Sequence, residues 1–383
     1  MKILLVVPLF PPDKGVSTFR AESFAKSLGA LHSVSILKLG DSTDLVPNRF
    51  INTINKNLMR TLTQAIFNKK KIHAILKDFI KRFDCVIVSV PHNALIQIAL
   101  ISKAEKVPCI LDIRDHPDLV YFETIFSKGM FHRIGRLIML KFNEYFVNKA
   151  AKSSSAVICV GERSCEFQKA KTPSIAHKIF NVHNGFYEKD LKIISEIKRL
   201  SKKFVGLEIG ISGSIYSFRD TVSLRTVFAK LDSAAISTSI QIHHWGMLSE
   251  ELKEYVHNLK HLKYNCYNSI DRQTYLENII QCNCVLLACS DSLIWEPTTT
   301  VFDYLLLGKP IIFSGNGENE AYRILSECKM KVIKGENFKI EEMMDVVKEP
   351  CKFPELELLA RYSREFQNKK LIDIINKITA HKK

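Results

Sequence analysis

The sequence predicts an α/β protein with two consecutive domains, each built around a doubly wound parallel sheet. The chain has 383 residues, of which 46% are hydrophobic, and this length exceeds what one ordinary core requires. Short apolar runs alternate with longer stretches of helical spacing, and this alternation occurs twice. The two series are separated after Asn184-Gly185-Phe186 by the charged stretch Lys189–Lys203, which carries no strand pattern.

The apolar runs are short and continuous, as expected of parallel strands that are buried on both faces. The first series predicts strands at Ile3–Phe10, Ser33–Leu39, Val86–Val90, Cys109–Ile113, Ala156–Val160 and Ile179–Val182. The second predicts strands at Val205–Ile211, Ser239–His243, Lys263–Tyr267, Cys284–Ala288 and Pro310–Phe313. The helical stretches between them predict right-handed crossovers and two Rossmann-like sheets. The predicted divisions are residues 1–188, a linker at 189–204, a second domain at 205–354 and C-terminal helices at 355–383.

Charge and cysteine content narrow the partners and the compartment. A net charge of +15 favours nucleic acid, an anionic membrane or a phosphorylated ligand. The ten cysteines include no CxxC pair, which disfavours zinc, and many lie in apolar runs, as in proteins of a reducing compartment. No signal peptide is recognisable, and no run reaches the roughly eighteen apolar residues that a membrane span needs. We therefore expect a cytoplasmic protein.

Several enzyme classes lack their motifs in this chain. There is no Gly-x-Ser-x-Gly elbow, no His-Glu-x-x-His pair and no Gly-x-Gly-x-x-Gly after the first strand. These absences argue against a serine hydrolase, a zinc protease of that type and a nicotinamide-dependent oxidoreductase. We interpret His243-His244 as packing or loop residues rather than metal ligands.

Residues 295–310 predict a loop, a short helix and a stop. Thr298, Thr299 and Thr300 are candidate N-cap residues, and Gly308 ends the helix before the next strand. The free amides at such a helix start suit a pyrophosphate, and the threonine hydroxyls add donors. Asp303 lies one turn into the helix, where its carboxylate can accept hydrogen bonds from ribose hydroxyls. The alternative is a capping box in which Asp303 only caps Thr300.

A second candidate for anion binding follows the first strand of the second half, at Gly210–Arg219. Its glycines, including Gly213, allow the backbone to approach a phosphate closely. Arg219 is placed to neutralise a diphosphate leaving group as negative charge develops on it. The alternative is an ordinary glycine-rich turn with an exposed arginine.

Over nearly the whole chain, these and other elements resemble the family 4 (group 1) glycosyltransferases of GT-B fold, of the bacterial polysaccharide type. The matching elements come in the family's order: Lys2–Gly15 as first strand and glycine loop, Arg20 with Ala25–Leu28, Leu111–Pro117 as an Asp-x-Arg-Asp-Pro-Trp element, Val182–Phe186, Gly213–Tyr216, Val301–Ile311, and Arg361–Glu365 in the closing helix. The resemblance implies that the two sheets face a cleft and that the C-terminal helices pack back on the first domain.

The resemblance also implies a reaction. The donor substrate would be a nucleoside diphosphate sugar, with no cofactor and no metal, and the acceptor a glycan or lipid-linked glycan of capsule, O-antigen or exopolysaccharide synthesis. Transfer would retain configuration, and the leaving diphosphate would assist removal of the acceptor's proton.

Family roles transfer to matching positions of this chain. Asp303 would bind the ribose, and Thr298, Thr299, Thr300 and Arg219 the diphosphate. Gly15, Gly213 and Ser214 would lie beside the donor. Asp115 and Arg219 are the implied catalytic residues, with Arg114 and His116 on the acceptor side.

The chain departs from the family pattern at several phosphate-binding positions. Val16 replaces the second glycine of the first loop, and Ser214 stands where the family usually has a basic residue. Thr299-Thr300 occupy a place where many relatives carry lysine, and Asp303 replaces the commoner glutamate. Two alternatives therefore stay open: a catalytically weak or inactive GT-B protein that binds a nucleotide or a partner transferase, and a sugar-nucleotide epimerase of the same architecture.

The positive charge is concentrated in the first half of the chain. Asn55–Arg82 holds eight Lys or Arg against the single acid Asp78, interleaved with apolar residues, and Phe126–Lys149 repeats the pattern. Basic residues beside an apolar stripe suit an anionic membrane surface, and the alternative is two core-packing helices with solvated basic backs. We expect peripheral attachment to the inner face of the membrane, a polyprenyl-diphosphate-linked acceptor and no nucleic acid, since aromatic residues do not interleave with the basic runs as stacking requires.

Overall fold

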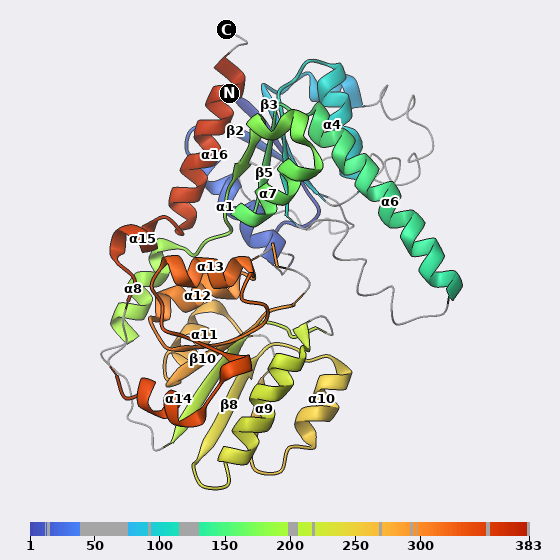
Figure 1. The fold of residues 1–383 in the computed structure, drawn as a ribbon. Helices are drawn as coiled ribbons and strands as arrows, with labels where there is room; N and C mark the ends of the chain where they lie inside the picture. Colours follow the sequence, from blue (N-terminus) through green and yellow to red (C-terminus); the bar gives the residue numbers. More distant parts are fainter. Residues whose placement is uncertain are drawn as a thin grey trace. The chain divides into compact units, whose positions relative to one another are not determined.

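The computed structural model describes residues 1–11, 13, 16–38, 76–90, 93–114, 130–197, 206–216, 219–267, 270–291, 294–295, 297–349 and 353–380. The chain forms two compact units (Figure 1). Unit 1 comprises Met1–Asn184 together with Glu365–Lys383, and unit 2 comprises Gly185–Arg364. Both are Rossmann-like α/β units, as the sequence predicts.

Unit 1 is built on a six-stranded parallel sheet in the order β2-β1-β3-β4-β5-β6. The six strands are those predicted from the apolar runs, with ends that differ by a few residues: β1 Lys2–Val7, β2 Ser33–Lys38, β3 Cys85–Val90, β4 Cys109–Ile113, β5 Ala156–Cys159 and β6 Ile179–Asn181. The described helices around it are α1 Val16–Gly29, α4 Asn93–Ala104, α6 Met130–Ser153, α7 Glu162–Lys171, the 3-10 helix Pro173–Lys178 and α16 Arg364–Thr379. Separate apolar clusters cover the two faces, one with α4 and α6 and the other with α1 and α16.

Unit 2 has a second six-stranded parallel sheet, in the order β12-β11-β10-β7-β8-β9. Its strands are β7 Leu207–Ser212, β8 Ile240–Trp245, β9 Lys263–Tyr267, β10 Cys284–Ala288, β11 Ile311–Ser314 and β12 Val332–Lys334. Its helices are α8 Glu188–Ile197, α9 Val222–Ala234, α10 Glu250–His257, α11 Arg272–Ile279, α12 Thr300–Leu307, α13 Glu320–Glu327, the 3-10 helix Gly335–Asn337, α14 Ile340–Val346 and α15 Leu356–Ala360. Strand β12 is not predicted from the sequence because its apolar run is only Val332-Ile333, between Lys331 and Lys334.

The units divide at places that differ from the predicted boundaries at 188, 204 and 354. Helix α8, predicted as a linker, belongs to unit 2 because Ile194 is buried in the core of that unit. Helix α15 also belongs to unit 2, where Leu359 and Tyr362 are buried in the same core. From Glu365 onward α16 belongs to unit 1, and Leu371 is buried there against β1 and α1.

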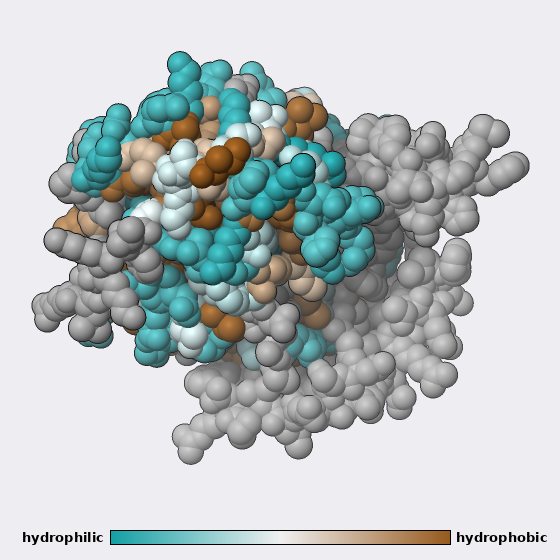
Figure 2. Space-filling model, turned by 90° about the horizontal axis from the view of Figure 1, so that it is seen from below, coloured by the Kyte–Doolittle hydropathy of each residue, from teal (hydrophilic) through white to brown (hydrophobic). Residues whose placement is uncertain are grey.

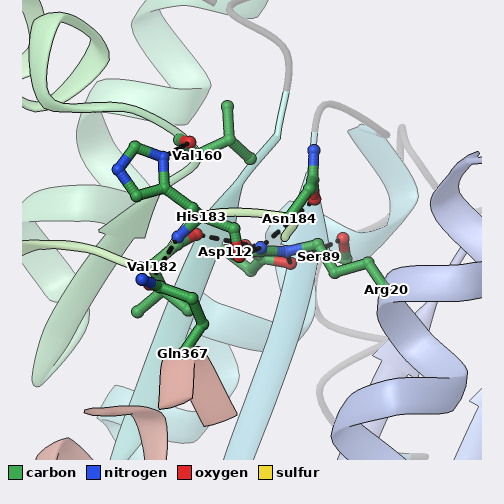
Figure 3. A network of polar contacts seen from close by, with 8 residues as sticks. All are labelled: Arg20, Ser89, Asp112, Val160, Val182, His183, Asn184 and Gln367. Atoms are coloured by element: carbon green, nitrogen blue, oxygen red, sulfur yellow. Dashed lines mark hydrogen bonds and ion pairs between the residues drawn. The ribbon is translucent and has the colours of Figure 1, made fainter. Parts of the chain in front are cut away.

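A buried ion pair in unit 1 ties the sheet to the segment that leads out of it (Figure 3). Arg20 on α1 and Asp112 on β4 are both about 2% exposed, and the Arg20 Nη2 atom lies 2.9 Å from Asp112 Oδ1. Arg20 Nη1 also donates to the carbonyl oxygens of Val182 and His183, at 2.9 and 3.2 Å. One guanidinium group therefore joins α1, β4 and the segment after β6.

The segment after β6 is also held by α16. Gln367 accepts a hydrogen bond at 2.8 Å from the backbone amide of His183, and the His183 ring donates from Nδ1 to the carbonyl of Val160 (Figure 3). On the other side of the boundary, within unit 2, Phe186 and Ser363 form a parallel bridge. The chain passes between the units twice, near residue 184 and near residue 364. These two segments contact each other within unit 1, through His183 and Gln367, and within unit 2, through Phe186 and Ser363.

The face of the molecule drawn in Figure 2 is mainly hydrophilic, and its hydrophobic residues occur in small groups. Such scattered apolar residues are normal for a protein surface and do not mark a binding site. Among the described residues, no helix combines the length and apolar character needed to cross a membrane.

We predict that Arg20→Met lowers the free energy of unfolding by about 3–5 kcal/mol, because it leaves the Asp112 carboxylate buried without its counter-ion. Urea unfolding followed by far-ultraviolet circular dichroism measures the change. Lys26→Met is the control, since Lys26 lies on the same helix in an exposed pair with Glu22. If the two substitutions lower the free energy of unfolding equally, the contacts of Arg20 do not stabilise the packing of α1 against β4 and the segment after β6.

Candidate functional site

Four of the predicted site residues of unit 2 lie where strand β7 ends: Gly213, Ser214, Arg219 and Thr300. An ideal Cβ on Gly213, the residue after β7, would lie 3.2 Å from Thr300 Oγ1, so Gly213 and Thr300 are in direct contact. Thr300 Oγ1 also donates to the carbonyl of Ser212, at 3.4 Å. Parallel sheets bind ligands at the carboxyl ends of their strands, and these residues lie at that edge.

The backbone after β7 continues alongside the backbone after β8. The amide of Gly213 donates to the carbonyl of Trp245 at 3.0 Å, and the amide of Ile215 donates to that of Met247 at 2.8 Å. Gly246 makes this approach possible: its φ is +158°, and a Cβ there would lie 2.4 Å from the carbonyl oxygen of Gly213. A side chain at Gly246 would therefore displace the Gly213–Ser214 backbone.

His244 fixes the orientation of the Gly213–Ser214 peptide. Its side chain is fully buried, and Nε2 lies 2.8 Å from the carbonyl oxygen of Gly213, which can only accept. Nε2 therefore carries the proton, and Nδ1, 3.1 Å from the hydroxyl of Tyr264, accepts from it. Burial lowers the pKa of His244, which favours this neutral form.

In a trans peptide the C=O and N–H groups point in opposite directions. Because His244 draws the Gly213 carbonyl toward the interior, the amide of Ser214 points away from it. Among the residues that the structure describes, none accepts a hydrogen bond from this amide. As far as the described residues are concerned, the Ser214 N–H is thus a donor that a ligand can use.

Arg219 returns to the same loop. Its Nη1 donates to the carbonyl oxygen of Ser214 at 3.1 Å. Burial raises the pKa of Cys289, directly after β10, to about 12, and the charge of Arg219 nearby partly offsets this effect. Position 214 carries serine where the resembling family usually has a basic residue, and Arg219 brings a basic group to the same place from five residues further along the chain.

Helix α12 begins at Thr300, with Thr299 at the N-cap position, but the prediction that threonine side chains cap it is wrong for Thr299. The Thr299 side chain makes no capping hydrogen bond. The amides of Val301 and Phe302 instead donate to the carbonyls of Thr298 and Thr299, at 3.1 and 3.2 Å. Gly308 ends the helix in the left-handed conformation, with φ +64°, as predicted.

Tyr304 anchors α12 to the sheet. Its buried hydroxyl accepts a hydrogen bond from the amide of Ser212 and donates to the carbonyl of Leu286, both at 3.0 Å. One side chain thereby fixes the helix against β7 and β10, and sets Thr300 and Asp303 relative to the loop at Gly213.

Asp303 does not form the capping box that was the alternative interpretation. Its two carboxylate oxygens accept hydrogen bonds from Nη1 and Nη2 of Arg272, each at 2.7 Å. Arg272 in turn contacts Asp190 on α8, with Nη2 2.8 Å from Oδ2. Arg272 and Asp190 cannot be recognised from the sequence as partners of Asp303, because they lie 31 and 113 positions before it and share no motif with it.

The predicted site residues of unit 1 are only partly described. Arg114 follows β4 directly and is half-buried, and its amide donates to the carbonyl of Val90 at 3.4 Å. Gly15, Asp115 and His116 lie outside the described residues. Their predicted roles therefore stay predictions.

The two histidines at 243 and 244 lie within β8 and not in a loop, since the strand continues to Trp245. They point to opposite faces of the sheet, and only His244 contacts the candidate site. Within the described ranges, no group of three or more histidine, cysteine or acidic side chains is arranged to hold a metal ion.

Comparison with known proteins identifies the fold and nothing finer. No protein-family model matches the sequence, and no curated protein does. Among solved structures, HepE from Anabaena, in complex with UDP and glucose, matches with a TM-score of 0.66 at 13% identity, over 98% of this chain and 100% of that one.

Two further structures extend the comparison. A glycosyltransferase from Rickettsia africae matches with a TM-score of 0.61 at 15% identity, over 98% of each chain. A UDP-GlcNAc 2-epimerase from Neisseria meningitidis, bound to UDP-GlcNAc, matches with a TM-score of 0.56 at 12% identity, over 98% of this chain and 100% of that one. These likenesses show the two-unit α/β fold of GT-B type.

The lowered pKa of His244 predicts a specific dependence of stability on pH. The unfolded chain takes up a proton on this residue below about pH 6.5 and the folded chain does so only at lower pH, so stability falls as the pH drops below that value. His244→Gln keeps a donor for Gly213 and cannot be protonated. We expect the melting temperature to fall less between pH 7.5 and 5.5 in the variant than in the wild type.

Tryptophan fluorescence is the suitable measurement for this prediction, because both tryptophans of the chain, Trp245 and Trp295, belong to unit 2. His257→Gln is the control, since His257 lies at the end of α10, away from the loop. If the wild type and His244→Gln lose stability in parallel as the pH falls, His244 is not the buried neutral group inferred here.

Proposed function

We propose that this protein is a glycosyltransferase that moves a sugar from a nucleoside diphosphate sugar to a glycan or lipid-linked acceptor. The observation that carries the proposal is the cluster at the carboxyl edge of the unit 2 sheet: Gly213, Ser214, Arg219 and Thr300. Structures of the same fold, HepE and a UDP-GlcNAc 2-epimerase, hold UDP or a UDP-sugar. A diphosphate is the ligand that this cluster suits best.

The chemistry of the cluster matches a diphosphate leaving group. The Ser214 amide and the Arg219 guanidinium offer hydrogen bonds to phosphate oxygens, and a charged donor strengthens such bonds. In the transfer, the bond between the sugar's anomeric carbon and the diphosphate oxygen breaks and a bond to the acceptor oxygen forms. The acceptor's proton passes to the released diphosphate, and charge on that group is stabilised by Arg219. We propose that the reaction proceeds without a metal and with retention of configuration.

An epimerase acting on a nucleotide-sugar is the second candidate, because UDP-GlcNAc 2-epimerases share the fold. The two functions differ in their products. In the first case, incubation of the purified protein with UDP-glucose or UDP-GlcNAc and a glycan acceptor gives free UDP and a glycoside, and without an acceptor it gives only slow hydrolysis to UDP and free sugar. It gives an isomer from the donor alone in the second. Nucleotide binding without either product indicates the third possibility, an inactive GT-B protein.

We predict that Arg219→Ala weakens binding of UDP, GDP, ADP or CDP, whichever binds the wild type most tightly, by about tenfold or more, because it removes a charged hydrogen-bond donor. Isothermal titration calorimetry measures the affinity. Arg225→Ala is the matched control, since Arg225 belongs to the same unit and pairs with Asp220. Lack of binding of all four nucleotides to the wild type would refute the proposed function itself.

A membrane-bound acceptor is the second part of the proposal, and helix α6 supports it. The exposed positions in its described half are Lys141, Phe142, Tyr145, Lys149 and Lys152, all on one face. Phe142 is 44% and Tyr145 59% exposed, so aromatic side chains do interleave with the lysines of this run, contrary to the expectation from the sequence. The opposite face buries Leu140, Val147, Ala150 and Ala151 in the core of unit 1.

Three lysines and two aromatic rings on one exposed helix face suit the surface of an anionic membrane, where aromatic side chains lie at the level of the headgroups. We infer that this face of α6 holds the protein on the inner side of the cytoplasmic membrane. A polyprenyl-diphosphate-linked acceptor would be available there. Most of the predicted basic stretch Asn55–Arg82 lies outside the described residues.

We predict that combined replacement of Lys141, Lys149 and Lys152 by glutamine weakens binding to vesicles containing phosphatidylglycerol on the order of a hundredfold, at about 1 kcal/mol per lysine. Co-sedimentation measures the effect. The control replaces Lys253, Lys329 and Lys348, three exposed lysines of unit 2, by glutamine. Equal binding by both variants would remove α6 from the proposal.

A further inference from the structure

The Asp303 carboxylate belongs to a charge cluster that joins three helices of unit 2. Arg272, at the start of α11, lies between Asp303 on α12 and Asp190 on α8. Nη1 and Nη2 each donate to one oxygen of Asp303 at 2.7 Å, and Nη2 and Nε donate to Asp190 Oδ2 at 2.8 and 3.3 Å. A planar guanidinium can hold two carboxylates in this way only in a narrow range of orientations.

The charges decide what this cluster can bind. One guanidinium lies between two carboxylates, so the cluster as a whole carries a single negative charge. Burial alone would lower the pKa of Arg272, but the Asp303 and Asp190 carboxylates raise it overall, so Arg272 stays charged. A diphosphate would be repelled by the net negative charge. A ligand that donates hydrogen bonds, such as a hydroxyl group, would be attracted.

Burial separates the roles of the two carboxylates. The Asp190 side chain is fully buried, whereas that of Asp303 is 16% exposed. Each oxygen of a carboxylate has two lone pairs, and Arg272 occupies one on each oxygen of Asp303. The remaining lone pairs allow Asp303 to accept one hydrogen bond on each oxygen, which matches the two adjacent hydroxyls of a ribose.

We propose that Arg272, anchored by Asp190, is a positioning residue that sets the Asp303 carboxylate for recognition of the ribose diol of the nucleotide. The inference rests on the proposed function, since it assigns the ribose-binding part of the same site. Arg272 fixes the plane of the carboxylate through its two hydrogen bonds. Asp190 holds Arg272 from the opposite side and does not touch the ligand.

The experiment compares a ribonucleotide with its deoxy analogue. Isothermal titration calorimetry of the full-length protein uses whichever of UDP, GDP, ADP and CDP binds most tightly, and the 2′-deoxy form of the same nucleotide. A hydroxyl that donates to a carboxylate contributes about tenfold in affinity or more, so the wild type should prefer the ribonucleotide by that factor. Arg272→Gln should reduce the preference to about one- to twofold, because the Asp303 carboxylate is then free to rotate.

Further variants separate positioning from stability. Arg272→Lys keeps the charge but not the paired donors, so it should preserve more stability than Arg272→Gln without restoring the preference. Arg225→Gln is the matched control, because Arg225 forms a similar two-bond pair with Asp220 elsewhere in unit 2. It should lower stability and leave the preference unchanged. If Arg272→Gln does not fold, the double variant with Asp190→Asn removes the unpaired buried charge.

The outcomes distinguish the two proposals. If no nucleotide binds the wild type, the proposed function fails and the inference falls with it. If the wild type binds and prefers the ribonucleotide, but the preference survives in Arg272→Gln or in the double variant, only the inference is overturned, and Arg272 is then a structural tie between helices. If the wild type binds both nucleotides equally, Asp303 does not contact the 2′-hydroxyl, which also refutes it.

Discussion

The parallel pairing of all six strands in unit 2 is the constraint on which the candidate site depends. It places the residues that follow β7, β8 and β10 at one edge of the sheet, although they are far apart in the sequence. Two features then bring these loops together. Gly246 lets the backbone after β8 lie against Gly213, and the hydroxyl of Tyr304 joins α12 to both β7 and β10. The polar groups of the site are positioned by backbone contacts that only a few residue types permit.

Two arginines near this edge have different roles because their neighbours differ. Arg219 donates a hydrogen bond to the carbonyl oxygen of Ser214. Arg272 lies between two carboxylates, which together exceed its charge. In the proposed function, Arg219 binds an anionic part of the ligand, whereas the cluster around Arg272 binds a part that donates hydrogen bonds. A nucleotide presents both kinds of group, a diphosphate and a ribose, at neighbouring positions.

The sequence was sufficient to predict the fold because parallel strands buried on both faces produce continuous apolar runs. Eleven of the twelve strands were predicted in this way, and β12 was not, because its apolar run is only Val332-Ile333 between two lysines. Domain boundaries were less accurate because α8 and α15 join unit 2 through buried residues such as Ile194 and Leu359, and amphipathic helices do not reveal which core they join.

The candidate site was predicted where a glycine, a threonine or a helix start marks it locally. Gly213, Thr300 and Arg219 are brought together in unit 2. The parts that were missed, His244, Arg272 and Asp190, act through contacts between residues distant in the sequence. The orientation of the Gly213–Ser214 peptide by His244 depends on the pairing of β7 with β8, and that pairing has no signature in either segment alone.

Unit 1 is assembled from both ends of the chain, and this has a consequence for the order in which the protein folds as it is synthesised. Helix α16 contributes Leu371, Ile374 and Ile375 to the same apolar cluster as β1 and α1. Unit 2, by contrast, is continuous from Gly185 to Arg364. On the ribosome, one face of the sheet of unit 1 is therefore covered only in part, by α1, until α16 emerges. The unit translated second can complete its own core before that happens.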